Sequence, residues 1–366
     1  MKFKCKKDNL ENGISIVQKA TSNKTTLPLL EGILVEAYDK LRLTGNDLEI
    51  GIEYYLDADI IDKGSIVINS KMFGEIVRRL PDSEVTIEVK ENNLVIIDCE
   101  QSHFEIKGMP SEGFPSLPEI EKQNSFKISQ KTIRDMIKQT IFCVCLDDFR
   151  PILTGSLIEF DKGELTIVSL DGNRVAIRKS NLEYSENSFN VVIPAKTLNE
   201  IIKILQPVDD EIYIYSSKNQ IMFENNNFKV VSKLLEGEFF KYRYLLTKDH
   251  ETKAIVNTKK FLQSIERAYL ITSEEKEKSY PVKFKISSDN MIITSNTPNG
   301  SVREEISIEM WGNDMEISFN PKYLIDALKA IDDEEINLYF TSNPGPLTIK
   351  PLEGENFAYI IMSLRG

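Results

Sequence analysis

The spacing of hydrophobic and polar residues along the chain repeats three times. Each copy has a short apolar run, an amphipathic stretch, a turn rich in Asp or Pro, and an alternating run. Apolar positions at i, i+3, i+4 and i+7 indicate a helix and alternation indicates a strand, so each copy predicts strand, helix, turn and strand. These copies cover residues 67–89, 192–215 and 318–340.

Two further patterns precede each copy in the same order. The first is an alternating strand followed by an amphipathic helix, at residues 1–20, 125–144 and 254–272. The second is a pair of strands around an Asp- or Asn-rich turn with a return strand, at residues 27–54, 150–178 and 279–306.

The repeated order predicts an α+β chain of three tandem domains, each with two helices packed on antiparallel sheets. Polar stretches near Gln123 and Lys248 interrupt the pattern and place the boundaries. The expected domains are therefore 1–122, 123–248 and 249–366. Three unrelated α+β domains of similar composition are the alternative.

The predicted helices have an apolar stripe and, in five of the six, a basic pair on the opposite face. At about 100° per residue, Lys71 and Arg78 lie roughly 160° from the centre of the stripe that Phe73 and Val77 help to form. The first helix breaks the rule. The other basic pairs are Lys131/Lys138, Lys196/Lys203, Lys260/Arg267 and Lys322/Lys329. The six predicted helices span 8–20, 70–80, 130–142, 195–205, 258–268 and 321–330.

Charge is segregated by element. The 366 residues carry a net charge of −12, yet basic residues outnumber acidic ones two to one within the six predicted helices. Solvated Lys and Arg on helix surfaces would be the simpler explanation. Evenly spaced basic residues without interleaved aromatic side chains or base-reading amides also suit a phosphate backbone contacted without sequence preference.

Composition disfavours an enzyme, a metalloprotein and a membrane protein. Two histidines, His103 and His250, are too few for a zinc site or a histidine-based triad, and no phosphate-loop or nucleophile-elbow motif is present. The start of the chain lacks an apolar signal core, no run is long enough to span a membrane, and four cysteines form no CxxC pair. A cytoplasmic protein with reduced thiols and no cofactor is expected.

Geometry constrains how a helix-lined cationic surface could hold DNA. If the sheets lie outside, six helices spaced about 10 Å apart close on a ring with about 9 Å of clear width, too narrow for a duplex of roughly 20 Å. A ring of twelve helices has a clear width of about 28 Å. Two head-to-tail copies of the chain could therefore encircle a duplex, whereas one copy could not.

The whole chain closely resembles the bacterial DNA polymerase III beta subunits, a family of sliding clamps. The resemblance lies in the order and spacing of several segments together. They are TLPLLEGIL at 26–34, LTGNDLE at 43–49, LDGNRVA at 170–176, EGEFFKYRYLL at 236–246, FNPKYLIDALKAI at 319–331 and AYIIMSLRG at 358–366.

The resemblance implies a ring-shaped homodimer that acts as a non-catalytic processivity factor on duplex DNA. Its implied partners are a clamp loader, the polymerase III alpha subunit, and other polymerases and repair proteins that carry a clamp-binding peptide. That peptide would enter a pocket between the second and third domains. The pocket residues implied are Leu153, Leu170, Gly172, Asn173, Arg174, Val175, Phe240, Tyr244, Leu245, Pro346, Ile360, Met362, Ser363, Leu364 and Arg365.

The resemblance also implies a DNA contact and a dimer contact. Lys24 matches a basic DNA-contacting position, whereas the loop around Asp147, Pro151 and Ile152 departs from the family pattern, as do Phe240 and Tyr244 in the pocket. The dimer contact falls on Ile76, Phe104 and Ile106 against Leu270 and Ile271.

Two other functions remain open from the residues alone. One is a protein-binding scaffold that does not encircle DNA. The other is an enzyme using carboxylates such as Asp47 and Asp171. These two aspartates occupy equivalent repeat positions, which favours a turn role, with each side chain bonding nearby backbone amides.

Overall fold

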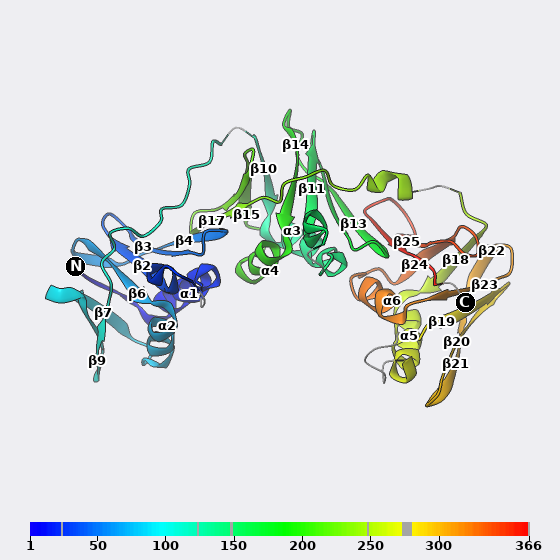
Figure 1. Cartoon of the computed structure of the whole chain (residues 1–366), viewed down its shortest axis with the longest axis horizontal. Coiled ribbons are helices and arrows are strands. Elements are labelled where there is room, and N and C mark those ends of the chain that lie inside the picture. Colours follow the sequence, from blue (N-terminus) through cyan, green and yellow to red (C-terminus); the bar gives the residue numbers. More distant parts are fainter. Residues whose placement is uncertain (23–24, 123, 147–148, 247–248, 273–279, 365–366) are drawn as a thin grey trace. The chain divides into compact units, whose positions relative to one another are not determined.

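The computed structural model describes residues 1–22, 25–122, 124–146, 149–246, 249–272 and 280–364. Figure 1 shows the helices and strands, and the chain divides into two compact units. The first unit contains residues 1–130 and 203–234, and the second contains 131–202 and 235–366. All neighbouring strands in the sheets of both units pair antiparallel.

The first unit has two sheets and two helices. Its helices are α1 (Lys7–Val17) and α2 (Ser70–Arg79). The eight-stranded sheet has the order β10 (Asn124–Ser129), β15 (Glu211–Ser216), β16 (Gln220–Glu224), β17 (Phe228–Lys233), β4 (Ile50–Leu56), β3 (Leu41–Asn46), β2 (Gly32–Ala37) and β6 (Gly64–Asn69). The five-stranded sheet has the order β5 (Asp59–Asp62), β1 (Lys2–Lys6), β7 (Glu84–Val89), β8 (Leu94–Cys99) and β9 (Ser102–Lys107).

The second unit also has two sheets. Its helices are α3 (Gln130–Lys138), α4 (Ala195–Ile204), α5 (Thr258–Thr272) and α6 (Pro321–Leu328), with the ends of α3 and α4 at the division between units. The nine-stranded sheet has the order β14 (Ser188–Pro194), β11 (Gly155–Asp161), β12 (Glu164–Leu170), β13 (Arg174–Asn181), β26 (Phe357–Ile361), β25 (Leu347–Pro351), β24 (Glu335–Phe340), β18 (Thr252–Asn257) and β22 (Glu309–Gly312). The four-stranded sheet has the order β21 (Gly300–Ser307), β20 (Asn290–Thr297), β19 (Val282–Ser287) and β23 (Met315–Phe319).

Short 3-10 turns join these elements. They are η1 (Gln18–Ala20), η2 (Pro28–Glu31), η3 (Glu91–Asn93), η4 (Ile141–Cys143), η5 (Pro151–Thr154) and η6 (Tyr242–Leu245). No helix in the described part of the chain has the length and apolarity that crossing a membrane requires.

All six helices predicted from the pattern are present, and most residues of their apolar stripes are buried, while Ile76, Ile202 and Ile331 are half-buried. Two ends differ from the prediction by four residues, and the other ends differ by three or fewer. Helix α3 stops at Lys138, where the Thr140 hydroxyl donates to the Met136 carbonyl at 2.9 Å and competes with the backbone for that acceptor. Helix α5 continues to Thr272, because its last turns also pack on β20 and β21.

The sheets are continuous across the junctions between repeats. Strand β17 of the second repeat pairs with β4 of the first, with Val231 opposite Gly51. Strand β26 of the third repeat pairs with β13 of the second, with Ile360 opposite Val175. We call these the first and second junctions. Since each junction is a strand pair inside one sheet, the compact units contain whole junctions rather than whole repeats.

Candidate functional site

An apolar cluster lies at the second junction. It gathers side chains from η5, η6 and the strands β11, β12, β13, β14 and β26, which are far apart in the sequence. We call it the junction cluster. Its buried members are Leu153, Leu157, Val168, Leu170, Val175, Ile177, Val192, Tyr242, Ala358 and Ile360.

The cluster brings together the apolar residues predicted for the peptide pocket. Leu153, Leu170, Val175 and Ile360 are buried members, and Leu245 packs against them. Burying such side chains together stabilises the junction by about 1.5–3 kcal/mol per fully buried residue. The predicted pocket floor is thus an apolar seam that the sheet itself assembles.

The remaining predicted pocket residues lie around this cluster rather than in it. Phe240, Tyr244 and Met362 are exposed, with 79% of Tyr244 accessible. Gly172 and Asn173 are exposed, and Pro346, Ser363 and Leu364 are half-buried. Arg365 lies outside the described residues.

The exposed rim is fixed by backbone hydrogen bonds. The amide of Met362 donates to the Asn173 carbonyl at 2.8 Å, and that of Leu364 donates to the Ser318 carbonyl at 2.8 Å. Gly172 has φ of +95°, a left-handed conformation that favours glycine in this turn. Met362 is therefore held on the turn between β12 and β13, and Leu364 is held on β23.

Tyr242 was not selected by the sequence analysis, although it lies in the cluster. Its hydroxyl donates to Glu159, and burial together with this bond raises the pKa of Tyr242. Phe239 and Leu246 pack against the cluster, whereas Phe240 and Tyr244 are exposed. The segment EGEFFKYRYLL offers several aromatic residues, and only the 3-10 turn η6 decides which of them face inward.

Arg174 is held on every side by contacts within the second unit. Its Nε donates to Asp171 at 2.8 Å, its Nη1 to Asp326 at 2.7 Å, and its Nη2 to the Phe142 carbonyl at 2.8 Å. Its guanidinium also lies 4.4 Å from the ring centroid of Tyr323, a cation–π contact. The positive charge of Arg174, a residue predicted for the peptide pocket, is thus already compensated by two carboxylates. Arg174 also joins β13 to α6.

The aspartates considered for catalysis form turns. Asp47 Oδ1 accepts from the amides of Glu49 at 3.0 Å and Ile50 at 2.8 Å. Asp171 Oδ1 accepts from the equivalent amides of Asn173 at 2.9 Å and Arg174 at 3.1 Å. The predicted turn role is confirmed at both positions.

The basic residues on the helix faces are exposed. This holds for Lys71, Arg78, Lys131, Lys138, Lys196, Lys203, Lys260, Arg267, Lys322 and Lys329, whereas Lys24 lies outside the described residues. Some of these cations have carboxylate partners: Arg78 pairs with Glu75 at 2.9 Å and Lys329 with Glu266 at 2.8 Å. Arg267 and Lys322 also have carboxylate partners, Glu304 and Asp326.

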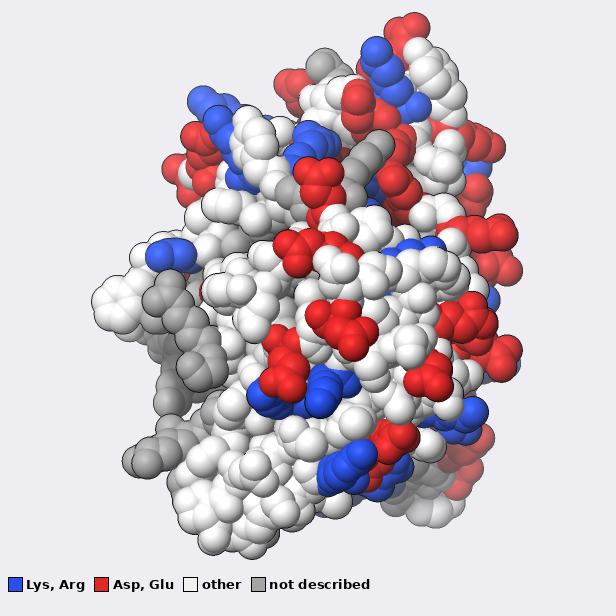
Figure 2. All heavy atoms as spheres, turned by 90° about the vertical axis from the view of Figure 1, so that its right-hand side faces the viewer, with Lys and Arg blue, Asp and Glu red and all other residues white. Residues whose placement is uncertain are grey.

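Of the ten helix-face cations, four form no ion pair within the described ranges. They are Lys71, Lys131, Lys138 and Lys260. Figure 2 shows that acidic side chains are spread widely over the face of the chain that it presents. This agrees with the excess of acidic residues that the sequence places outside the helices.

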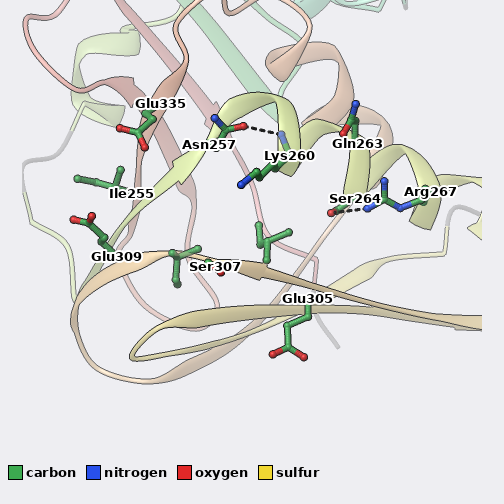
Figure 3. Close-up of a pocket in the computed structure, with 12 residues that line it drawn as sticks. Ile255, Asn257, Lys260, Gln263, Ser264, Arg267, Glu305, Ser307, Glu309 and Glu335 are labelled. Atoms are coloured by element: carbon green, nitrogen blue, oxygen red, sulfur yellow. Dashed lines mark hydrogen bonds between the residues drawn. The ribbon is translucent and has the colours of Figure 1, made fainter.

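A polar cavity of about 530 Å³ adjoins α5. Figure 3 shows Lys260 and Arg267 on this helix, above the strand that carries Glu305 and Ser307. The Arg267 guanidinium donates to Glu304 at 2.9 Å and lowers the pKa of that carboxyl. Lys260 is therefore the less constrained of the two cations for an external phosphate.

The residues predicted for the dimer contact lie near edge strands or helix ends. Phe104 and Ile106 lie on β9, the edge of the five-stranded sheet, and Ile76 lies half-buried on α2. Leu270 and Ile271 lie near the end of α5, which packs on β21, one of the two edge strands of the four-stranded sheet. Leu270 is exposed, as is Phe104.

Three tandem repeats, each pairing antiparallel sheets with helices that present exposed Lys and Arg, define a clamp of the DNA-binding class. Family models of the DNA polymerase III beta subunit match the chain in order: the N-terminal domain at residues 1–118, the central domain at 127–241 and the C-terminal domain at 243–365. The chain belongs to this family, and it is a DNA sliding clamp, a non-catalytic processivity subunit.

Individual relatives agree over the full length. The beta sliding clamp of Bacillus subtilis is 36% identical, with 100% of both chains covered. A putative DNA polymerase III beta subunit from Eubacterium rectale has 41% identity and a TM-score of 0.96, again over 100% of both chains. A Pseudomonas aeruginosa sliding clamp solved with bound griselimycin has 25% identity and a TM-score of 0.94, over 100% of both chains.

Proposed function

We propose that two copies of the chain assemble head to tail into a ring that encircles duplex DNA, with the helices inside and the sheets outside. The observation that carries this proposal is the row of exposed basic residues on five of the six helices. Twelve helices leave a clear width of about 28 Å, which a duplex of roughly 20 Å fits.

The dimer contact is proposed at Ile76, Phe104 and Ile106 of one protomer against Leu270 and Ile271 of its partner. Within the described residues, strand β9 pairs only with β8, and it carries the exposed Phe104. Such an edge invites aggregation unless another chain covers it. A head-to-tail partner would cover it.

The second junction is proposed as the docking site for peptides from the polymerase III alpha subunit, the clamp loader and other replication and repair proteins. The junction cluster supports this, since it provides an apolar seam rimmed by exposed Phe240, Tyr244 and Met362. Aromatic and methionine side chains at the rim suit an apolar peptide. We also propose that the three domains span residues 1–122, 123–248 and 249–366. The protein is proposed to act in the cytoplasm.

Charge reversal tests the encircling of DNA. The triple variant Lys138→Glu, Lys196→Glu and Lys203→Glu should reduce retention on primed circular DNA at least about tenfold, because repulsion replaces attraction to phosphates. The matched control is Lys40→Glu, Lys162→Glu and Lys218→Glu, three exposed residues in turns between sheet strands. Equal retention of the two variants would contradict the proposed DNA-facing surface.

A substitution at the rim tests peptide docking. Leu364→Asp should abolish processive synthesis with the polymerase III alpha subunit while the dimer still forms, because a carboxylate would adjoin the apolar seam. Leu352→Asp, at an exposed leucine in a turn of the third repeat, is the matched control. Full processivity of the Leu364 variant would remove this site from the proposal.

A further inference from the structure

The first junction has the same architecture as the second. Gly51 faces Val231 across β4 and β17, as Val175 faces Ile360 across β13 and β26. Both junctions follow an aspartate turn that holds two backbone amides, at Asp47 and at Asp171. A strand pair of the kind proposed to receive a peptide therefore occurs twice in the chain.

The chain's own linker covers the first junction. Leu117 lies directly over Gly51, so that a Cβ built on this glycine would be 1.9 Å from the Leu117 Cδ2. Ile120 is buried against Tyr215, Met222 and Val231. The two apolar side chains of the linker thus sit on the two members of one cross-strand pair.

Polar contacts hold the same segment at both ends. The Asn46 side-chain amide donates to the Pro115 carbonyl at 3.0 Å. Lys122 pairs with Glu224, and its ammonium lies 5.1 Å from the ring centroid of Tyr215. Pro115 and Pro118 restrict the backbone between these contacts, so less entropy is lost when the segment is bound.

Two of the positions that differ between the junctions touch the linker. Gly51 takes the place of Val175, and Asn46 takes the place of Leu170. Val175 fills with its own side chain the space that Leu117 fills above Gly51, and Leu170 offers no hydrogen bond to a backbone carbonyl. The first junction is therefore adapted to Leu117, whereas the linker before the third repeat packs on the second junction through Phe239, Tyr242 and Leu245.

We propose that the first junction is a second peptide site, whose ligand is the chain's own segment Pro115–Ile120. The comparison with a peptide site at the second junction rests on the proposed function. Leu117 occupies the space above Gly51, so the intact protomer leaves an external peptide no room at that position of the first junction. Release of the linker opens a second site for a Pro- and Leu-containing peptide.

The test uses the full-length protein and a labelled synthetic peptide with the sequence of residues 111–122. Leu117→Asp should release the linker and allow one additional peptide to bind per protomer, relative to the unsubstituted chain. The double variant Leu117→Asp, Gly51→Val should lose this extra binding, because the valine side chain fills the space above position 51 that the peptide leucine would occupy. The titration extends to the millimolar range, about the effective concentration of a segment on a short tether.

Each outcome decides the proposal. Extra binding by the single variant alone supports it. Absence of extra binding overturns it. If the free peptide does not bind at millimolar concentration, the same segment tethered in the intact chain would not be held at the junction by its own affinity. Extra binding by both variants also overturns it, because the peptide would then be seated elsewhere.

A second measurement applies to the intact linker. Gly51→Val alone should push Leu117 out and raise glutamyl endopeptidase cleavage at Glu119 and Glu121 at least tenfold, whereas Leu352→Ala should leave it unchanged. An unchanged rate in the Gly51 variant overturns the proposal even if Leu117→Asp fails to fold. The Leu364→Asp variant tests peptide docking at the second junction separately. A failure of that proposed function can therefore be distinguished from a failure of the proposal for the first junction.

Discussion

Asp171 has two roles in its turn. Its Oδ1 accepts from the amides of Asn173 and Arg174, and its Oδ2 accepts from the Arg174 Nε at 2.8 Å. Asp171→Ala should lower the free energy of unfolding by about 2 kcal/mol, because it removes the turn bonds and takes a carboxylate from a half-buried guanidinium. Asp171→Asn keeps an acceptor for the two amides and should cost less. Calorimetric melting of both variants checks this, and equal losses would contradict it.

His103 gives a pH-dependent prediction on the edge strand β9. Its ring lies 2.6 Å from Asp98, whose hydrogen bond raises the pKa of His103. A raised folded-state pKa means that the stabilisation is complete below the ordinary value of about 6.5 and is lost as the pH rises through the raised value.

Proton NMR titration measures this directly, because the chain has only two histidines. Asp98→Asn should move the pKa of His103 back toward its ordinary value, and His103→Gln assigns the resonance. An unchanged pKa in the Asp98 variant would rule out this carboxylate as the cause.

At the scale of elements, Arg174 links one strand of the second unit to a helix and to the segment after another helix. Arg174 on β13 binds Asp326 on α6 and the carbonyl of Phe142, which follows α3. Arg174→Met should destabilise the second unit by about 2–3 kcal/mol, somewhat less than the loss typical of a fully buried pair, because two carboxylates lose their partner.

Arg178 on the same strand provides the matched control. It lies over the Phe357 ring, 5.7 Å from its centroid, and its side chain pairs with no carboxylate in the described ranges. Arg178→Met should therefore change the melting temperature much less than Arg174→Met. Equal shifts would show that the links from Arg174 to α6 contribute little.

At the scale of the whole molecule, the two edge strands of the five-stranded sheet allow a controlled test of the proposed dimer contact. Phe104→Arg on β9 and Ile271→Arg near the end of α5 should each yield monomers, because a buried unpaired charge opposes the proposed contact. Ile61→Arg, on the opposite edge strand β5 of the same sheet, should leave dimers intact. Sedimentation measures the result, and dimers from both interface variants would refute the assigned contact.

The repeat, the six helices, the aspartate turns and the faces that carry Lys and Arg were all predictable from the residues alone. These features follow from local periodicity and from side chains that bond their own backbone, so short windows contain the necessary information. The family followed from the order of such segments along the full length.

Which residues meet at the junctions could be read only from the folded chain. Tyr242 rather than Tyr244 enters the cluster, Arg174 binds Asp326, and Leu117 covers Gly51. Each of these contacts depends on strands that pair across repeats and on turns that select one face of a segment. Such long-range pairing is set by packing of the whole sheet, which no local pattern encodes.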